Sequence, residues 1–109
     1  MTDDILVFIT TASVQEAEQI ANALVAKRLA ACGNIVPDIR SVFWWKAAIE
    51  TAPEALLILK SRTALFPAIT DMVQALHSYE VPEIIAMPIL FGSESYLRWI
   101  DQETSPLQM

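Results

Sequence analysis

Apolar residues occur along this chain with two different spacings, and their order predicts the fold. Residues 5–9 form an unbroken apolar run, which is typical of a strand buried on both sides. Over residues 17–25 the apolar positions recur every three or four residues, as on one side of a helix. Ser13 and Glu16 precede this stretch at the spacing of a capping box. We expect the helix to end near Leu29.

The middle of the chain has the pattern of a long β-hairpin. Residues 35–45 and 49–61 both favour strands, and residues 46–48 are expected to form the turn between them. Pro37 and Pro53 predict an irregularity in each strand, because proline has no N–H to donate to the ladder. The two strands are long for a small sheet, so the tip of the hairpin is expected to project beyond the body of the domain.

A second helix and a short strand follow the hairpin. Thr63 is a candidate N-cap for a helix with apolar residues at helical spacing over 65–76. Residues 77–82 form a loop that leads to a strand over 83–89. Ser93 is then placed to begin a last helix.

These elements run β-α-β-β-α-β with an added C-terminal helix, which is the ferredoxin-like split-βαβ order of α+β proteins. It predicts one domain over residues 1–109, with a four-stranded antiparallel sheet and two helices on one side. Trp44 and Trp45 are neighbours in a strand and must point to opposite sides of the sheet. A domain of this size does not cover both sides of an apolar sheet by itself, so we expect further copies of the chain to do so.

Composition narrows the classes of partner and the location. The formal charge is −6, with 13 acidic against 7 basic residues, which argues against nucleic acid and anionic membranes. The same charge permits cation binding, although solubility alone explains it. Cys32 is the single cysteine, so no intrachain disulfide forms and a reducing compartment fits. The first residues lack the positive charge of a signal peptide, and no apolar stretch approaches the ~20 residues of a spanning helix. We therefore expect a cytoplasmic protein.

Candidate chemistry is sparse, and no catalytic constellation occurs, so we expect no enzymatic activity. With only Gly33 and Gly92, the chain cannot build a glycine-rich phosphate loop. Cys32 fits either a small buried hydrophobic residue or a soft ligand for a copper-like ion. His77 fits a helix C-terminal cap, a metal ligand or part of a small polar pocket. One thiol and one imidazole do not complete a soft-metal site unless carboxylates or other copies contribute.

A second candidate site combines the end of the second hairpin strand with the loop after the second helix. Glu54, Lys60, Tyr79 and Glu80 are expected to meet there. They fit either a surface ion-pair cluster of little energetic weight or a polar binding cleft at a subunit boundary.

Five segments carry a family resemblance through their order and spacing. They are Ala31-Cys32, then Trp44-Trp45-Lys46 with Ile49-Glu50, then Glu54-Ala55-Leu56-Leu57-Ile58-Leu59-Lys60-Ser61, then His77-Ser78-Tyr79-Glu80-Val81-Pro82-Glu83-Ile84, then Tyr96-Leu97-Arg98-Trp99-Ile100. In this order they resemble the CutA divalent-cation-tolerance proteins over essentially the whole chain.

The resemblance implies a tight homotrimer with a role in divalent-metal tolerance, copper binding and no catalysed reaction. It maps the family's cysteine onto Cys32, its strand-end lysine onto Lys60 and its loop motif onto His77, Tyr79, Glu80 and Pro82. It makes Cys32 and His77 the candidate metal ligands, and Lys60, Tyr79 and Glu80 a candidate inter-subunit cleft.

The chain departs from the family pattern at two places. Ala47 stands where the family usually has glycine, which suggests a different turn at the hairpin tip. After the cysteine the family usually has Cys-Val-Asn or a similar sequence, and here Cys32-Gly33-Asn34 keeps the asparagine two residues on.

Two other classes of function compete with metal tolerance. Trimers of ferredoxin-like subunits resemble the PII signalling architecture, so a small-molecule sensor with ligand clefts between subunits is the first alternative. A structural scaffold is the second.

Overall fold

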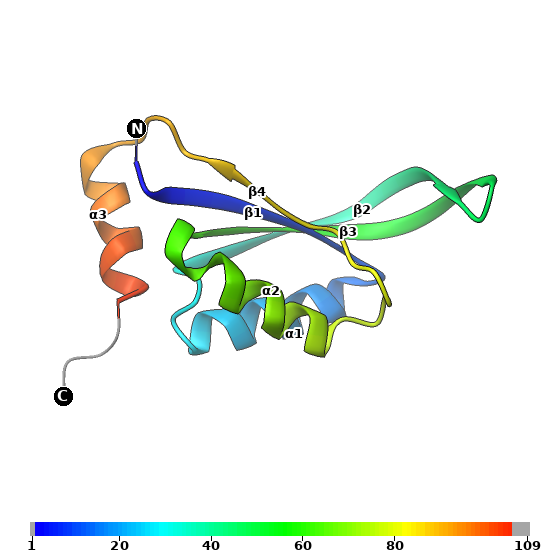
Figure 1. The fold of residues 1–109 in the computed structure, drawn as a ribbon, viewed down its shortest axis with the longest axis horizontal. Helices are drawn as coiled ribbons and strands as arrows, with labels where there is room; N and C mark the ends of the chain where they lie inside the picture. Colours follow the sequence, from blue (N-terminus) through cyan, green and yellow to red (C-terminus); the bar gives the residue numbers. More distant parts are fainter. Residues whose placement is uncertain (1, 106–109) are drawn as a thin grey trace.

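The computed structural model describes residues 2–105 and contains four strands and three α-helices in this range. The elements are β1 (Asp4–Thr11), α1 (Val14–Ala26), β2 (Cys32–Trp45), β3 (Ala48–Arg62), a 3₁₀ turn (Thr63–Leu65), α2 (Phe66–Leu76), β4 (Ile84–Pro88) and α3 (Glu94–Glu103). All strand pairs are antiparallel and the sheet order is β2-β3-β1-β4, which confirms the predicted α+β topology. Helices α1 and α2 lie under one side of the sheet, and α3 lies across the end opposite the hairpin tip (Figure 1).

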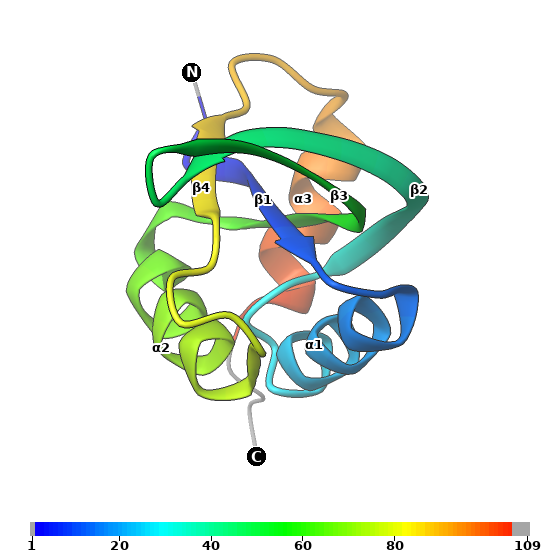
Figure 2. The ribbon, with the colours of Figure 1, turned by 90° about the vertical axis from the view of Figure 1, so that its right-hand side faces the viewer.

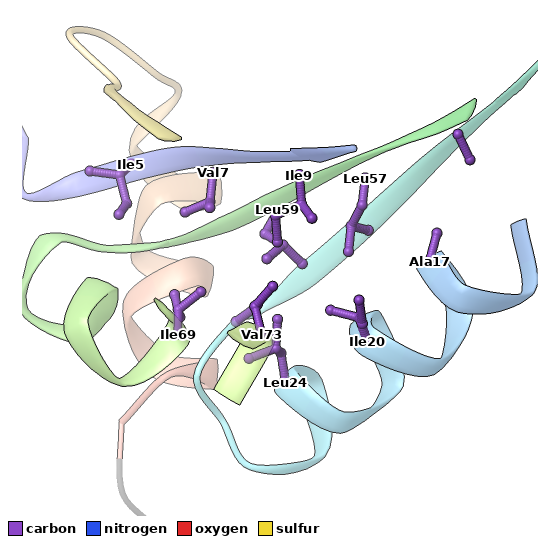
Figure 3. Packing of buried hydrophobic residues seen from close by; sticks show 12 residues of the cluster. Ile5, Val7, Ile9, Ala17, Ile20, Leu24, Leu57, Leu59, Ile69 and Val73 are labelled. Carbon is purple, nitrogen blue, oxygen red and sulfur yellow. The ribbon is translucent and has the colours of Figure 1, made fainter. Parts of the chain in front are cut away.

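The core lies between the sheet and the two helices α1 and α2. Strand side chains alternate, so every second residue of β1 and β3 points toward the helices. These residues pack against the apolar side of each helix, as Figure 3 shows. The buried cluster comprises Ile5, Val7, Ile9, Ala17, Ile20, Leu24, Ala30, Ala55, Leu57, Leu59, Ile69 and Val73.

The other side of the sheet carries no helix over most of its length, and we call it the open face (Figure 2). The strand register places apolar side chains from all four strands on this side. They are partly or well exposed: Leu6 and Phe8 from β1, Val36 from β2, Leu56 and Ile58 from β3, and Ile85 and Met87 from β4. An apolar surface of this kind on a sheet is typical of an interaction surface.

Strand β3 has two strand neighbours only from Ala55 onward, because β1 ends at Thr11, opposite Ala55. Between Ala55 and the turn, over residues 48–54, the described part of the chain pairs β3 with β2 alone. We call residues 39–54, which continue past this point, the hairpin arm; it projects from the body as predicted (Figure 1). Large side chains on the arm are exposed, including Trp44 at 71% and Trp45 at 50%.

The tip of the arm is a two-residue turn in which both central residues have positive φ. Lys46 has φ 49° and Ala47 has φ 67°, and Trp45 pairs with Ala48 across the turn. This is the type I′ geometry, whose twist matches the flanking strands. The expectation that Ala47 indicates a different turn is therefore wrong: strand twist and pairing enforce the conformation even without glycine.

The two prolines of the hairpin behave differently. At Pro37 the ladder shifts between Val36 and Ile39, so β2 contains the predicted irregularity, with Asp38 at φ 60°. At Pro53 the register continues without a shift, so the second predicted irregularity is wrong. There β3 has a strand neighbour on one side only, and proline is tolerated at such an edge position.

Helix boundaries differ from the sequence pattern in two places. Helix α1 begins with the predicted cap, in which the Glu16 N–H donates to Ser13 Oγ at 3.1 Å, but it ends at Ala26 because Arg28 takes φ 59°. Thr63 opens a 3₁₀ turn instead of capping α2, and its hydroxyl donates to the Asp3 carbonyl at 3.0 Å. Within residues 2–105, no helix combines the length and apolarity needed to cross a membrane.

Candidate functional site

A cleft of about 860 Å³ lies where the hairpin arm meets the loop after α2, and we call it the arm cleft. Its wall combines carboxylates with aromatic rings from β2, β3 and the loop. These are Glu50, Glu54, Glu80 and Glu83 together with Phe43, Trp45 and Tyr79. No lysine or arginine is among the residues that line it. This lining suits a cationic group and opposes a phosphate.

Tyr79 joins the loop to the base of the arm. Its hydroxyl donates a hydrogen bond to Glu54 Oε2 at 2.6 Å. Burial, then the hydrogen bond and charge of Glu54, raise the pKa of Tyr79. The phenol therefore stays protonated and acts as a fixed donor to the carboxylate. The structure thus brings together Glu54, Tyr79 and Glu80, three of the four residues expected to meet.

His77 is the C-terminal cap residue of α2, and its side chain is buried beneath the loop. The Tyr79 N–H donates to Nδ1 at 3.0 Å, and Nε2 lies 2.7 Å from the Thr10 carbonyl oxygen. Because a backbone N–H only donates and a carbonyl only accepts, this geometry assigns the proton to Nε2. Both ring nitrogens are thus occupied within the chain, and a metal at either one would have to displace a bond.

Glu16 fixes the same loop from the start of α1. Its Oε1 accepts from the Ala12 N–H at 3.0 Å and its Oε2 from the Ser78 N–H at 2.7 Å. Burial acts to raise the pKa of Glu16, but these hydrogen bonds and the nearby His77 lower it overall. The sequence pattern assigned Glu16 to helix capping alone, and no local signal links it to a loop 62 residues away.

A second polar cluster surrounds Cys32 at the other end of the open face. Cys32 is half-buried and pairs across the ladder with Lys60, whose ammonium donates to Asn34 Oδ1. The Cys32 Sγ lies 3.7 Å from the same Asn34 oxygen. Burial, together with the Cys32 thiol as a hydrogen-bonding neighbour, raises the pKa of Tyr96 on α3. The two-residue spacing of Cys32 and Asn34 on one strand already places them on the same side, whereas the sequence offered no signal that Tyr96 would meet Cys32.

The predicted site residues therefore fall into two groups within one chain. Lys60 lies six residues along β3 from Glu54, which corresponds to about 20 Å of strand. Lys60 is thus not brought to Tyr79 and Glu80, and Cys32 is not brought to His77. Over residues 2–105, no cluster of three or more His, Cys, Asp or Glu side chains is arranged to hold a metal ion. The residues of a single chain do not fit a closed copper site.

Comparison with known proteins matches the chain to one family throughout. Residues 5–103 match the family model described as CutA1 divalent ion tolerance protein. Divalent-cation tolerance protein CutA of Archaeoglobus fulgidus is 48% identical over 96 residues, covering 88% of this chain and 93% of the relative. The solved structure described as the periplasmic divalent cation tolerance protein CutA of that organism has a TM-score of 0.91 at 45% identity. The match covers 94% of this chain and 99% of that one.

Longer relatives match over the same region. The protein described as Protein CutA 1, chloroplastic, of Oryza sativa subsp. japonica is 43% identical over 100 residues, covering 92% of this chain. The chain spans about half the length of such plant and mammalian relatives, 56% and 54% in two cases.

Proposed function

The chain belongs to the CutA1 divalent ion tolerance family, and from this membership we propose that it acts in divalent-cation tolerance as a homotrimeric, non-enzymatic protein that binds copper or another divalent cation. The observation that carries the proposal is the family match over residues 5–103. The assembly, the metal and the cellular location are inferences from the features described above.

The proposed trimer rests on two apolar surfaces that one chain leaves uncovered. One is the open face, and the other is the hairpin arm with its exposed tryptophans. The two strands of the arm also have unpaired outer edges beyond the end of β1. Threefold symmetry would cover these surfaces and edges at once, because every subunit would make the same head-to-tail contact with the next one around a closed ring.

The proposed metal site uses Cys32 as the soft donor, with His77 as the alternative anchor. Thiolate favours Cu(I), whereas imidazole and carboxylate ligands favour Cu(II). A single chain offers too few donors near Cys32, so further ligands would have to come from other copies. For His77, metal binding would require release of the bond from the Tyr79 N–H.

The proposed ligand cleft of Lys60, Tyr79 and Glu80 must also draw on two copies. Lys60 lies at one end of β3 and the Tyr79–Glu54 pair lies toward the other. Only a neighbouring subunit can therefore bring a Lys60 ammonium to the carboxylates of the arm cleft. Such a contact would place a cation against Glu54 and Glu80, which matches the acidic lining.

Nucleotide sensing of the PII kind is not favoured by the lining of the arm cleft. A nucleotide needs donors and positive charge around its phosphates. Four glutamates line this cleft instead. A catalysed reaction is likewise not proposed, because the Cys32 thiol and the His77 imidazole lie apart and cannot act as a nucleophile and base pair.

We place the protein in the cytoplasm, because its single thiol suits a reducing compartment. Chromosomal tagging followed by fractionation would test this location. Recovery with periplasmic or organellar markers would contradict it.

Sedimentation equilibrium and copper titration test the rest of the proposal. We expect a mass three times that of the 12.1 kDa chain at micromolar concentration. Calorimetric titration with copper, under reducing and oxidising conditions, is expected to show binding that weakens in Cys32→Ser. A monomer mass would contradict the assembly. Identical affinity and stoichiometry in wild type, Cys32→Ser and His77→Ala would exclude both residues as ligands.

A further inference from the structure

The start of β1 meets α3 through a pair of carboxyl groups. Asp4 is only 3% exposed and stands opposite Arg62, whose side chain reaches Thr104 at the C-terminal end of α3. The Asp101 carboxyl of α3 is within hydrogen-bonding reach of it. Over the described residues 2–105, Asp4 Oδ1 is a buried oxygen that has no hydrogen-bond partner. A buried carboxylate in this position lacks the donors that would stabilise its charge.

The charged groups around Asp4 come from three elements and do not neutralise it. Asp101 faces it from α3, Asp3 precedes it on the chain, and Arg62 lies opposite it on β3. The Arg62 guanidinium is committed elsewhere, since it donates to the Thr104 hydroxyl and carbonyl, both at 2.8 Å. Asp4 therefore faces two carboxylates and one cation that only partly offsets them.

Two carboxyl groups this close favour a shared proton over two negative charges. With one proton, the Asp4 hydroxyl donates to the Asp101 carboxylate and joins β1 to α3. Burial, followed by the hydrogen bond and charge of Asp101, raises the pKa of Asp4 to about 6. Loss of the proton to solvent removes the donor and leaves like charges opposed across the helix–sheet contact.

We propose that the Asp4–Asp101 pair is a proton-dependent latch that holds α3 against the sheet. When the pair carries its proton, the latch is closed. When the proton leaves, α3 loosens around Asp101 but stays attached through Glu103 and Thr104, which follow Asp101 at the C-terminal end of the helix. There Arg62 holds Thr104, and Arg28 holds Glu103 at 3.1 Å. The Arg28–Glu103 attachment is independent of the Asp4 proton, whereas Arg62 also faces Asp4 across the strand pair.

The latch governs more than the helix itself, because Tyr96 of α3 neighbours the Cys32 thiol. Loosening of α3 withdraws this neighbour from the single cysteine of the chain. A lower proton concentration therefore makes Cys32 more accessible through a contact at the far end of the helix.

Hydrogen exchange of the full-length protein, followed by mass spectrometry at pH 5 and pH 8, tests the latch. After correction for intrinsic exchange, protection of α3 amides is expected to fall about tenfold in the wild type, since one pKa unit corresponds to tenfold. Asp4→Asn keeps a donor at every pH and is expected to abolish this fall. Asp101→Asn, at an exposed helix position, is expected to abolish it too. Unchanged α3 protection in the wild type would overturn the proposal, and so would persistence of the fall in both variants.

Glu94→Gln is the matched control, because Glu94 is an exposed carboxylate on the same helix that, among residues 2–105, pairs only with Arg98. It is expected to keep the wild-type fall in protection. A second readout is the rate of Cys32 alkylation, compared at the single pH of 7.5 so that thiol ionisation is constant. We expect Asp4→Asn to react several-fold more slowly than wild type. Equal rates, with equal α3 protection at that pH, would contradict the latch.

Discussion

Strands β2 and β3 pass through two environments and carry large apolar side chains in both. In the body, Leu57 and Leu59 are fully buried beneath α1 and α2. In the hairpin arm, Val42, Trp44 and Ile49 are 63–71% exposed. The two strands are paired in both regions: the ladder shifts once, between Val36 and Ile39 where body and arm meet, and then continues without a break from Glu54 to the turn.

The difference teaches that an apolar strand pattern predicts burial without saying what buries it. Body residues are buried by helices of the same chain, and their apolar character stabilises the fold. Arm residues have no such cover, and their apolar character serves assembly in the proposed trimer. Substitutions in the two regions should therefore change different measurable quantities.

The largest expected effect is loss of fold stability from a body substitution. Leu59→Ala removes a fully buried side chain and is expected to lower the free energy of unfolding by about 4 kcal/mol. Guanidinium unfolding at fixed protein concentration measures this. Ile49→Ala, on the exposed arm, is the control. At protein concentrations too low for assembly, it should lower the free energy of unfolding by less than about 0.5 kcal/mol. If both variants lower the free energy of unfolding equally, the proposed difference between body and arm is contradicted.

The next effect is loss of assembly from an arm substitution. Trp45→Ala is expected to weaken association by about 3 kcal/mol, or roughly a hundredfold in dissociation constant, while circular dichroism stays unchanged. Sedimentation at several concentrations measures the change. Trp44→Ala is the comparison, since it removes the same side chain from the opposite side of the strand. If both variants keep the full oligomer, the arm does not contribute to the interface.

A smaller effect concerns the pH dependence of the body. The folded-state pKa of Asp4, about 6, lies above its ordinary value of 3.8, so the folded protein binds this proton more strongly than the unfolded chain. Its contribution is complete below about pH 4 and is lost as pH rises through 6. In the wild type, the free energy of unfolding should therefore fall by about 2 kcal/mol as pH rises, which is less than the pKa shift alone would give because Asp101 is exposed. Asp4→Asn should remove this fall.

Urea unfolding of both proteins from pH 4 to pH 8 provides the measurement. Glu16 acts in the opposite sense, because its pKa is lowered and its contribution is lost as pH falls. It is present in both proteins and cancels in their difference. If the free energy of unfolding changes with pH in the same way in wild type and Asp4→Asn, the assignment of this pH dependence to Asp4 is contradicted.

The smallest effect is at the tip of the arm. Ala47 has φ 67°, which costs a residue with a Cβ more than it costs glycine. Ala47→Gly is expected to raise the free energy of unfolding by about 1 kcal/mol. Ala48→Gly, one residue away and without positive φ, should lower it instead. A loss of stability in both variants would show that the turn is not strained.

The sequence predicted the fold well because each element had a local cause. The run at residues 5–9, the Ser13–Glu16 cap and the apolar spacing in both helices specified where the strand and helices lie. The turn at Ala47 was misjudged because strand twist, which is a property of the pair, overrides the preference of one residue. Pro53 was misjudged because the sequence does not give the strand register, in which β1 ends opposite Ala55 and leaves Pro53 with a strand neighbour on one side only.

The candidate site was predicted less well because its contacts join distant residues. Tyr79 and Glu54 were expected to meet and do, but Lys60 was grouped with them only by being on the same strand. A strand fixes direction and face, and six residues along it separate side chains by about 20 Å. The roles of Glu16 at Ser78 and of Asp101 at Asp4 are invisible in local patterns.

The extra residue in β2 near Asp38 reverses the numbering parity of that strand. Before this residue, the even-numbered Cys32 and Asn34 face the open side. After it, Ile39 stands opposite Glu54, which faces the open side, so the odd-numbered residues of β2 now face that side. Trp45, and not Trp44, therefore shares a side with Cys32. When arm sequences of relatives are aligned, positions should be counted backward from the turn at Lys46, since counting forward from Cys32 exchanges the two tryptophans.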